Sequence, residues 1–245
     1  MKFSIYIFLF ALLGFTSCKK ENLCDCVKST GPTNTIYHNV SNFTCISAKD
    51  KMDVYLTQGS EFEVKVEAGA NLQRLIKVEL DGETLKVSNA NRCNWVRGYK
   101  HKISIYITAP YFKHIKNAGL GTIASVGTIT QDEISVRIEN SGEVKLNLNT
   151  DKFYGSVHGN GDMYLAGTTK QIFSDFTGTN YLYASDLTIT DYAYLHSVSI
   201  GPAYINAPEN GLMDVIIDRS GNVYYTGNPS QINLTRNNKG NLIRD

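Results

Sequence analysis

The sequence predicts an all-β protein that ends in a β-solenoid, a single-stranded stack of coils similar to a right-handed β-helix, preceded by a smaller β-strand region. The composition favours strands, with 15 Tyr, 10 Phe and 20 Gly in 245 residues. Apolar and polar residues alternate between residues 38 and 110, which is the pattern of half-buried strands. From residue 111 to residue 245 the chain repeats itself about every 20 residues.

The repeat is marked by one corner residue per period, followed two residues later by an apolar residue. Both Gly and Asn tolerate a positive φ, so we expect a sharp left-handed corner at each of these places. A coil of this length cannot bury its inner face alone, so stacked coils should align Ile123, Val144, Met163 and Leu182 in one buried column. The alternative is a sandwich of evenly spaced hairpins. The expected corners are Gly121, Gly142, Gly161, Asn180, Gly201, Gly221 and Gly240.

Residues 38–110 are predicted as an N-terminal β region. Asp81-Gly82 lies between two alternating segments, which predicts a β-hairpin. The apolar residues at 103, 105 and 107 form a period-two strand that Pro110 ends. Residues 70–76 are the helical candidate, with a length of two turns.

The first residues resemble a bacterial lipoprotein signal. An apolar run is too short to span a bilayer comfortably and ends at Thr16-Ser17-Cys18, so residues 1–17 are predicted as a signal peptide and Cys18 as the acylated residue. Phe15 departs from the usual Leu of a lipobox. The alternative is a membrane anchor with an incidental cysteine. Residues 18–37 are then a lipidated tether, and Lys19 in place of Asp favours the outer membrane, with surface display as a further option because Lys20-Glu21 partly matches a surface-export signal.

Four cysteines remain after Cys18, at Cys24, Cys26, Cys45 and Cys93. In an oxidising envelope this even number predicts two disulfides, and a strained Cys24–Cys26 ring is the least favoured connectivity. The two other connectivities stay open. A four-thiolate zinc site is the weaker alternative, because Cys-x-Cys is not the usual zinc spacing and no His lies near; no metal or cofactor is expected.

The charge balance argues against a nucleic-acid partner. The whole chain carries 24 basic and 23 acidic residues, and removal of residues 1–17 takes away one Lys and no acid, which leaves 23 of each. A neutral protein has no general field that attracts phosphate backbones. The run at 97–102 is the most basic segment, and it is interpreted as a solvated linker, with contact to an anionic lipid or a glycan as the weaker alternative.

An aromatic pattern appears on the outer face of the predicted solenoid. The residue three after the corner should point outward, and in four successive repeats it is a tyrosine: Tyr164, Tyr183, Tyr204 and Tyr224. One interpretation is a stacking ladder that stabilises the coils. The other is a binding face for sugar rings, a peptide or another subunit.

No catalytic motif is found. The sequence has five His but lacks the HExxH, Gly-x-Ser-x-Gly and phosphate-loop patterns. A polysaccharide lyase or hydrolase is the enzyme alternative, since β-helix enzymes of that kind use clustered Asp residues. The Asp candidates lie at different distances from the corners, so they are expected not to converge, and the protein is predicted not to be an enzyme. These candidates are Asp162, Asp175, Asp186, Asp191, Asp214 and Asp218.

Several segments together resemble the putative auto-transporter adhesin, or head GIN domain, family. They are the Cys24-Asp25-Cys26 tail, residues 54–59 (VYLTQG), residues 93–97 (CNWVR) and the glycine corners. The resemblance implies a β-helix-like fold in a secreted or lipid-anchored envelope protein, and it supplies no catalytic residues.

The sequence thus predicts an outer-membrane lipoprotein with a non-catalytic solenoid. Its expected partners are the membrane, through the lipid, and a glycan or protein ligand. A structural role, with the tyrosines buried in a homo-oligomer, is the alternative.

Overall fold

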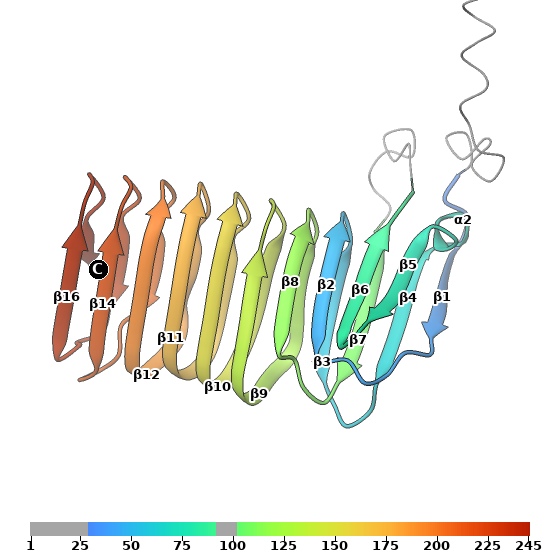
Figure 1. The fold of residues 1–245 in the computed structure, drawn as a ribbon, viewed down its shortest axis with the longest axis horizontal. Coiled ribbons are helices and arrows are strands. Elements are labelled where there is room, and N and C mark those ends of the chain that lie inside the picture. The colour runs from blue at the N-terminus through green and yellow to red at the C-terminus, as the bar shows by residue number, and fades with distance from the viewer. Residues whose placement is uncertain (1–28, 92–101) are drawn as a thin grey trace, which may run out of the picture.

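The computed structural model describes residues 29–91 and 102–245, whose strands all belong to one 17-stranded sheet wound into a β-solenoid (Figure 1). The predicted fold class is confirmed, and the hairpin sandwich is wrong because the repeats pair in parallel. The strands are β1 (Thr33–His38), β2 (Cys45–Asp50), β3 (Asp53–Gln58), β4 (Glu63–Gly69), β5 (Ile76–Asp81), β6 (Thr84–Asn89), β7 (Ser104–Ala109), β8 (His114–Gly119), β9 (Thr122–Ile138), β10 (Glu143–Gly159), β11 (Met163–Gly178), β12 (Leu182–Ser199), β13 (Ala203–Asn206), β14 (Leu212–Ile217), β15 (Val223–Thr226), β16 (Gln231–Arg236) and β17 (Leu242–Arg244).

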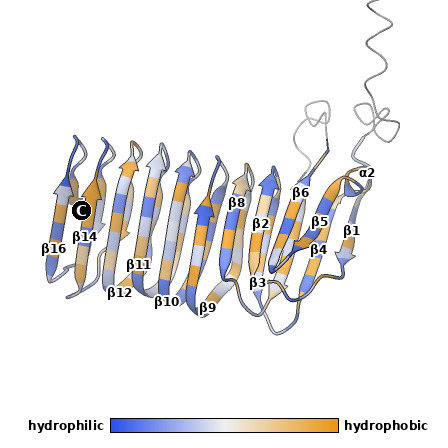
Figure 2. Ribbon diagram, in the orientation of Figure 1, coloured by the Kyte–Doolittle hydropathy of each residue, from blue (hydrophilic) through white to orange (hydrophobic). Residues whose placement is uncertain are grey.

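The coils build two rows of strands on opposite sides of the core. Row 1 contains β3, the first part of each of β9 to β12, and then β13, β15 and β17. Row 2 contains β2, β8, the last part of β9 to β12, and then β14 and β16. Hydrophobic and hydrophilic bands alternate along the strands in Figure 2, as expected when every second side chain points into the core.

The predicted buried column is confirmed. Val144 pairs with Ile123 on one side and with Met163 on the other, and Met163 pairs with Leu182. All four side chains are buried. The column continues to Leu242 at the C-terminal end, so one apolar interior runs through the stack.

The predicted reason for the corner residues is wrong. The structure describes all seven, and none has a positive φ. The glycines are needed because successive coils approach closely: a Cβ on Gly161 would overlap the carbonyl oxygen of Gly142, and one on Gly240 would overlap that of Gly221. The corner positions therefore form a column, in which each glycine lacks a side chain and so leaves room for the backbone of the preceding coil.

Asn180 replaces glycine in this column and uses its side chain to bind the backbone. Its Nδ2 donates to the carbonyl oxygens of Gly159, at 3.0 Å, and Thr177, at 2.9 Å. The side chain is buried, so these bonds replace water that the two carbonyl groups lose.

An antiparallel region closes the N-terminal end of the stack. β1 pairs with β4, and β4 pairs with β7. The Asp81-Gly82 hairpin is confirmed, with β5 antiparallel to β6 and Gly82 at φ 58°. The helix α2 (Ala70–Gln73) is a single turn, shorter than the predicted two.

The coils begin earlier in the chain than residue 111. β2 pairs in parallel with β8, and β3 pairs in parallel with β7 and β9, so residues 45–58 already form part of the stack. At the other boundary, Thr33–His38 lies in β1, which places the last residues of the predicted 18–37 tether in the sheet. The predicted signal peptide and Cys18 lie outside the described residues.

Candidate binding groove beside a tyrosine ladder

The four predicted tyrosines form a stacked column on the outer face of row 1. Ring centroids are 4.6 Å apart for Tyr164 and Tyr183, 5.7 Å for Tyr183 and Tyr204, and 5.1 Å for Tyr204 and Tyr224, with planes within 13° of parallel. The strand register places them opposite one another in successive coils. We call this column the tyrosine ladder; its geometry is as predicted, and its binding role stays a prediction.

Stacking decides which parts of the ladder a ligand can reach. Tyr183 has a ring on each side, so both of its faces are covered, and the same holds for Tyr204. Each ring pair contributes about 0.5–1.5 kcal/mol beyond the area it buries, which stabilises the stacked coils. What the inner rings offer to a ligand is their edges and hydroxyl groups.

The amine of Lys145 lies over the ring of Tyr164, at the N-terminal end of the tyrosine ladder. The Nζ of Lys145 lies 4.7 Å from the Tyr164 ring centroid and 2.7 Å from Glu143 Oε2. The hydrogen bond to Glu143 raises the pKa of Lys145, so the amine stays charged above the ring. Partial burial raises the pKa of Tyr164, which keeps its hydroxyl protonated.

A groove of about 580 Å³ runs beside the tyrosine ladder, over β9 to β13. Three ladder tyrosines line it, Tyr164, Tyr183 and Tyr204. Small apolar residues and uncharged polar groups supply much of the remaining lining, with one amine and one carboxylate. These further residues include Ala124, Ser125, Lys145, Asn147, Ala166, Ser185 and Asp186.

An irregular strand borders the groove on the N-terminal side. One residue separates Lys145 from Asn147 in β10, whereas three separate their partners Ala124 and Thr128 in β9. The two extra residues form a bulge in which Gly127 has φ 81°.

A second irregularity borders the groove on the other side. One residue separates Tyr164 from Ala166 in β11, and two separate their partners Tyr183 and Asp186 in β12. β10 and β11 have no extra residue at this place, so they lie between two strands that carry one. The groove therefore follows from uneven coil lengths, which also appear in the corner spacing: 21 residues from Gly121 to Gly142 and from Asn180 to Gly201, but 19 in each of the two coils between them.

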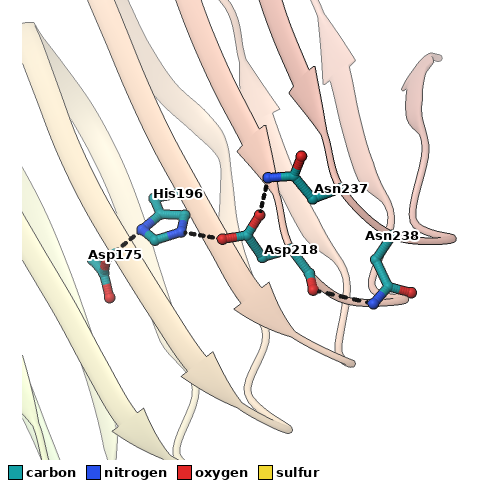
Figure 3. A network of polar contacts seen from close by, with 5 residues as sticks. All are labelled: Asp175, His196, Asp218, Asn237 and Asn238. Carbon is teal, nitrogen blue, oxygen red and sulfur yellow. Dashed lines mark hydrogen bonds and ion pairs between the residues drawn. The ribbon is translucent and has the colours of Figure 1, made fainter.

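A separate polar network lies on the outer face of row 2 (Figure 3). His196 Nδ1 is 2.8 Å from Asp175 Oδ2, and His196 Nε2 is 2.9 Å from Asp218 Oδ2. Asn237 donates to the other oxygen of Asp218 at 2.8 Å. The expectation that the Asp candidates do not converge is wrong for this pair, because Asp218 lies two residues beyond the exact register partner of His196 and still points outward.

The network favours the protonated form of the imidazole. Partial burial alone would lower the pKa of His196, but hydrogen bonds to Asp218 and Asp175 outweigh it and raise the pKa above 6.5. The bond from His196 lowers the pKa of Asp218. In its protonated form His196 donates from both ring nitrogens to carboxylates of the neighbouring coils, so the arrangement joins these coils.

We expect His196→Gln to cost more stability at about pH 5.5 than at about pH 9. A raised pKa in the folded protein stabilises it fully below 6.5, and the contribution disappears as pH rises through the raised value. The lowered pKa of Asp218 sets the acid limit, since its contribution is lost as pH falls through that value. Urea unfolding at the two pH values measures the difference. The same substitution in an Asp175→Asn, Asp218→Asn background serves as control, and an equal pH dependence there would contradict the prediction.

The other predicted site residues are distributed as follows. Cys45 begins β2, half-buried, with its Sγ 3.7 Å from Thr44 Oγ1. Cys18, Cys24, Cys26 and Cys93 lie outside the described residues, so the lipidation and the disulfides stay predictions. Most of the basic segment 97–102 also lies outside them. Within residues 29–91 and 102–245, no cluster of three His, Cys, Asp or Glu placed to hold a metal ion is found. No helix in that part of the chain is long and apolar enough to cross a membrane.

The stacked coils and the groove define a β-solenoid protein with a ligand-sized surface site. The chain belongs to the putative auto-transporter adhesin, head GIN domain family, whose model matches residues 42–229. This confirms the family resemblance of the sequence.

Solved structures share the fold. A putative adhesin from Bacteroides fragilis is 24% identical, with a TM-score of 0.80 over 87% of this chain and 97% of that chain. A putative adhesin from Parabacteroides distasonis is 17% identical, with a TM-score of 0.64 over 88% and 98%. A putative lipid binding protein from the same species is 16% identical, with a TM-score of 0.65 over 89% and 98%. At these identities the similarity establishes the fold alone. A search of curated proteins found no match.

Proposed function

We propose that this protein is an outer-membrane lipoprotein whose non-catalytic solenoid binds a glycan or protein ligand in the groove beside the tyrosine ladder. The observation that carries the proposal is the groove itself, which is lined by aromatic edges, small residues and a few polar groups. Ligand sites commonly combine apolar surface with a small number of polar groups that orient the ligand. Membership of an adhesin family supports a binding role at the cell envelope.

The groove can be tested by filling it. Ala166 lies between Asn147 and Asp186 in register and lines the groove, so Ala166→Trp should block it. Thr168→Trp is the matched control, because Thr168 is exposed on the same strand and is not among the lining residues. The assay measures retention of bacteria that display the full chain on mucin-coated surfaces, with surface display of each variant checked by antibody.

The expected result is loss of retention with Ala166→Trp and normal retention with Thr168→Trp. Equal retention by both variants would remove the groove from the function. Release of reducing ends from a polysaccharide by the purified protein, absent from a heat-inactivated sample, would overturn the non-catalytic part of the proposal.

The anchor has its own test. Cys18→Ser should abolish incorporation of labelled palmitate and leave the protein out of the outer-membrane fraction. Ser17→Ala keeps a small residue before the cysteine and should leave both unchanged. Palmitate incorporation by Cys18→Ser would contradict acylation at that residue.

A further inference from the structure

The tyrosine ladder is one part of a longer outward column that is interrupted at a single position. Before the interruption, Tyr55 stacks on Tyr106, with centroids 5.1 Å apart and planes 21° apart. After it come Lys145 and Tyr164. Ala124 lies between the two groups, paired with Tyr55 on one side and Lys145 on the other.

Ala124 leaves room for one ring. Neighbouring strands are roughly 4.8 Å apart, so the residues on either side of Ala124 are separated by roughly 9.6 Å along the stack. Atoms in contact are about 3.5–4.0 Å apart, so a ring of ordinary thickness fits above the alanine methyl group. Tyr106 covers one face of Tyr55, and Ala124, which lines the groove, lies on the side of the other face. Tyr55 is partly exposed and lies at the edge of the groove, so this second face is the one that a ring over Ala124 would contact. Lys145 leans toward Tyr164 and Glu143, away from this place.

The chemistry of the lining indicates what kind of ring would bind. Lys145 is paired with Glu143, Asp186 adds one carboxylate, and the other polar groups at the groove are uncharged, as in Ser125 and Asn147. An anionic ligand would meet little net positive charge. A sugar ring has an apolar face of C–H groups and a rim of hydroxyls, which matches an open aromatic face beside hydroxyl and amide groups.

The backbone argues against an extended peptide. At the groove, β10 and β11 each have a parallel partner on both sides, so no free strand edge is available to which a peptide could add.

We propose that a neutral glycan chain binds along the groove, with one pyranose ring seated over Ala124 against the open face of Tyr55. This rests on the proposed function and specifies its ligand class. The rest of the chain then follows the edges and hydroxyls of the tyrosine ladder, near Asn147 and Asp186.

The test places a tyrosine at position 124, where the column has only the small side chain of Ala124. Ala124→Tyr should lower affinity for the glycan about tenfold or more, because the new ring occupies the place of the sugar. Tyr55→Ala should lower it by up to about tenfold, because the stacking face is lost. Ser135→Tyr is the matched control: it adds a tyrosine to the same strand, β9, in register with Tyr154 on row 2. Its affinity should stay within about twofold.

The probes are cellohexaose, chitohexaose, mannohexaose and maltohexaose, titrated by calorimetry against the full chain in detergent. Thermal unfolding of each variant checks that the fold is retained. Binding of at least one probe, weakened by Ala124→Tyr and Tyr55→Ala and not by Ser135→Tyr, supports the proposal. No binding of any probe, or unchanged binding by Ala124→Tyr, overturns it.

Comparison with the retention assay separates the two proposals. If Ala166→Trp abolishes retention but none of the four oligosaccharides binds or competes, the groove functions with a ligand of another class, such as a protein, and only the glycan inference fails. If Ala166→Trp leaves retention unchanged, the proposed function fails as well.

Discussion

Replacing Gly161 with Ala will destabilise the protein by roughly 3 kcal/mol, the upper end of what overpacking usually costs. The added Cβ would overlap the carbonyl oxygen of Gly142 in the preceding coil. That oxygen belongs to the backbone of a coil packed on both sides, so it cannot rotate away as a side chain could. The free energy of unfolding in urea measures the effect.

Gly82→Ala is the control that separates steric overlap from backbone conformation. Gly82 has φ 58°, and no atom lies within 4 Å of the place that an alanine methyl group would take. Its substitution therefore costs only the strain of a left-handed alanine, about 1–2 kcal/mol. Gly161 has the opposite properties, with crowding and no positive φ. A loss at Gly161 no larger than that at Gly82 would contradict the steric explanation of the corner column.

Replacing Phe153 with Ala will cost about 3–5 kcal/mol, the usual range for a fully buried aromatic residue. Phe153 is completely buried between Ile134 and Ile172 of the adjacent coils. Its ring also packs against Gly155, where a Cβ would lie 2.8 Å from the ring. The ring thus fills space that the glycine leaves open, and alanine would leave a cavity there.

Tyr154→Ala is the matched control on the same strand. Tyr154 points outward, is 38% exposed and stacks on Phe173 at 5.1 Å, so its loss should cost about 1 kcal/mol. Urea unfolding of both variants gives the comparison. Similar losses for the two aromatic residues would mean that row 2 does not cover one continuous core.

The fold can be predicted because the sequence shows two periods: the two-residue alternation of apolar residues and the corner residue about every 20 residues. Alternation places Val144 and Leu146 inward, and the corner spacing places Val144 above Met163. The same counting places the tyrosine ladder correctly. The start of the stack is not predicted, because β4 to β7 come between β3 and β8 in the chain, so β2 and β3 have no neighbouring repeat in the sequence.

The reason for the glycine corners and the shape of the site require coordinates. A glycine in a sequence does not reveal whether it is needed for a positive φ or for close approach of another segment, and at Gly161 only the distance between coils decides. The groove depends on extra residues in β9 and β12, which lengthen the corner spacing from 19 to 21 residues, but the spacing does not show where in the coil these residues lie. Asp175, His196 and Asp218 are hydrogen-bonded although Asp218 lies two residues beyond the register partner of His196. Counting residues from the corner places the three side chains at different positions, so this contact cannot be predicted from the sequence.

The parallel register has a consequence for how such a protein can change its size. The main contacts of each described coil are with the coils next to it, so a segment of about 20 residues inserted between two corners would add one rung without disturbing distant parts of the core. The outer face would lengthen by roughly 4.8 Å with each rung. The length of the solenoid would then change in fixed steps, one for each rung that is gained or lost.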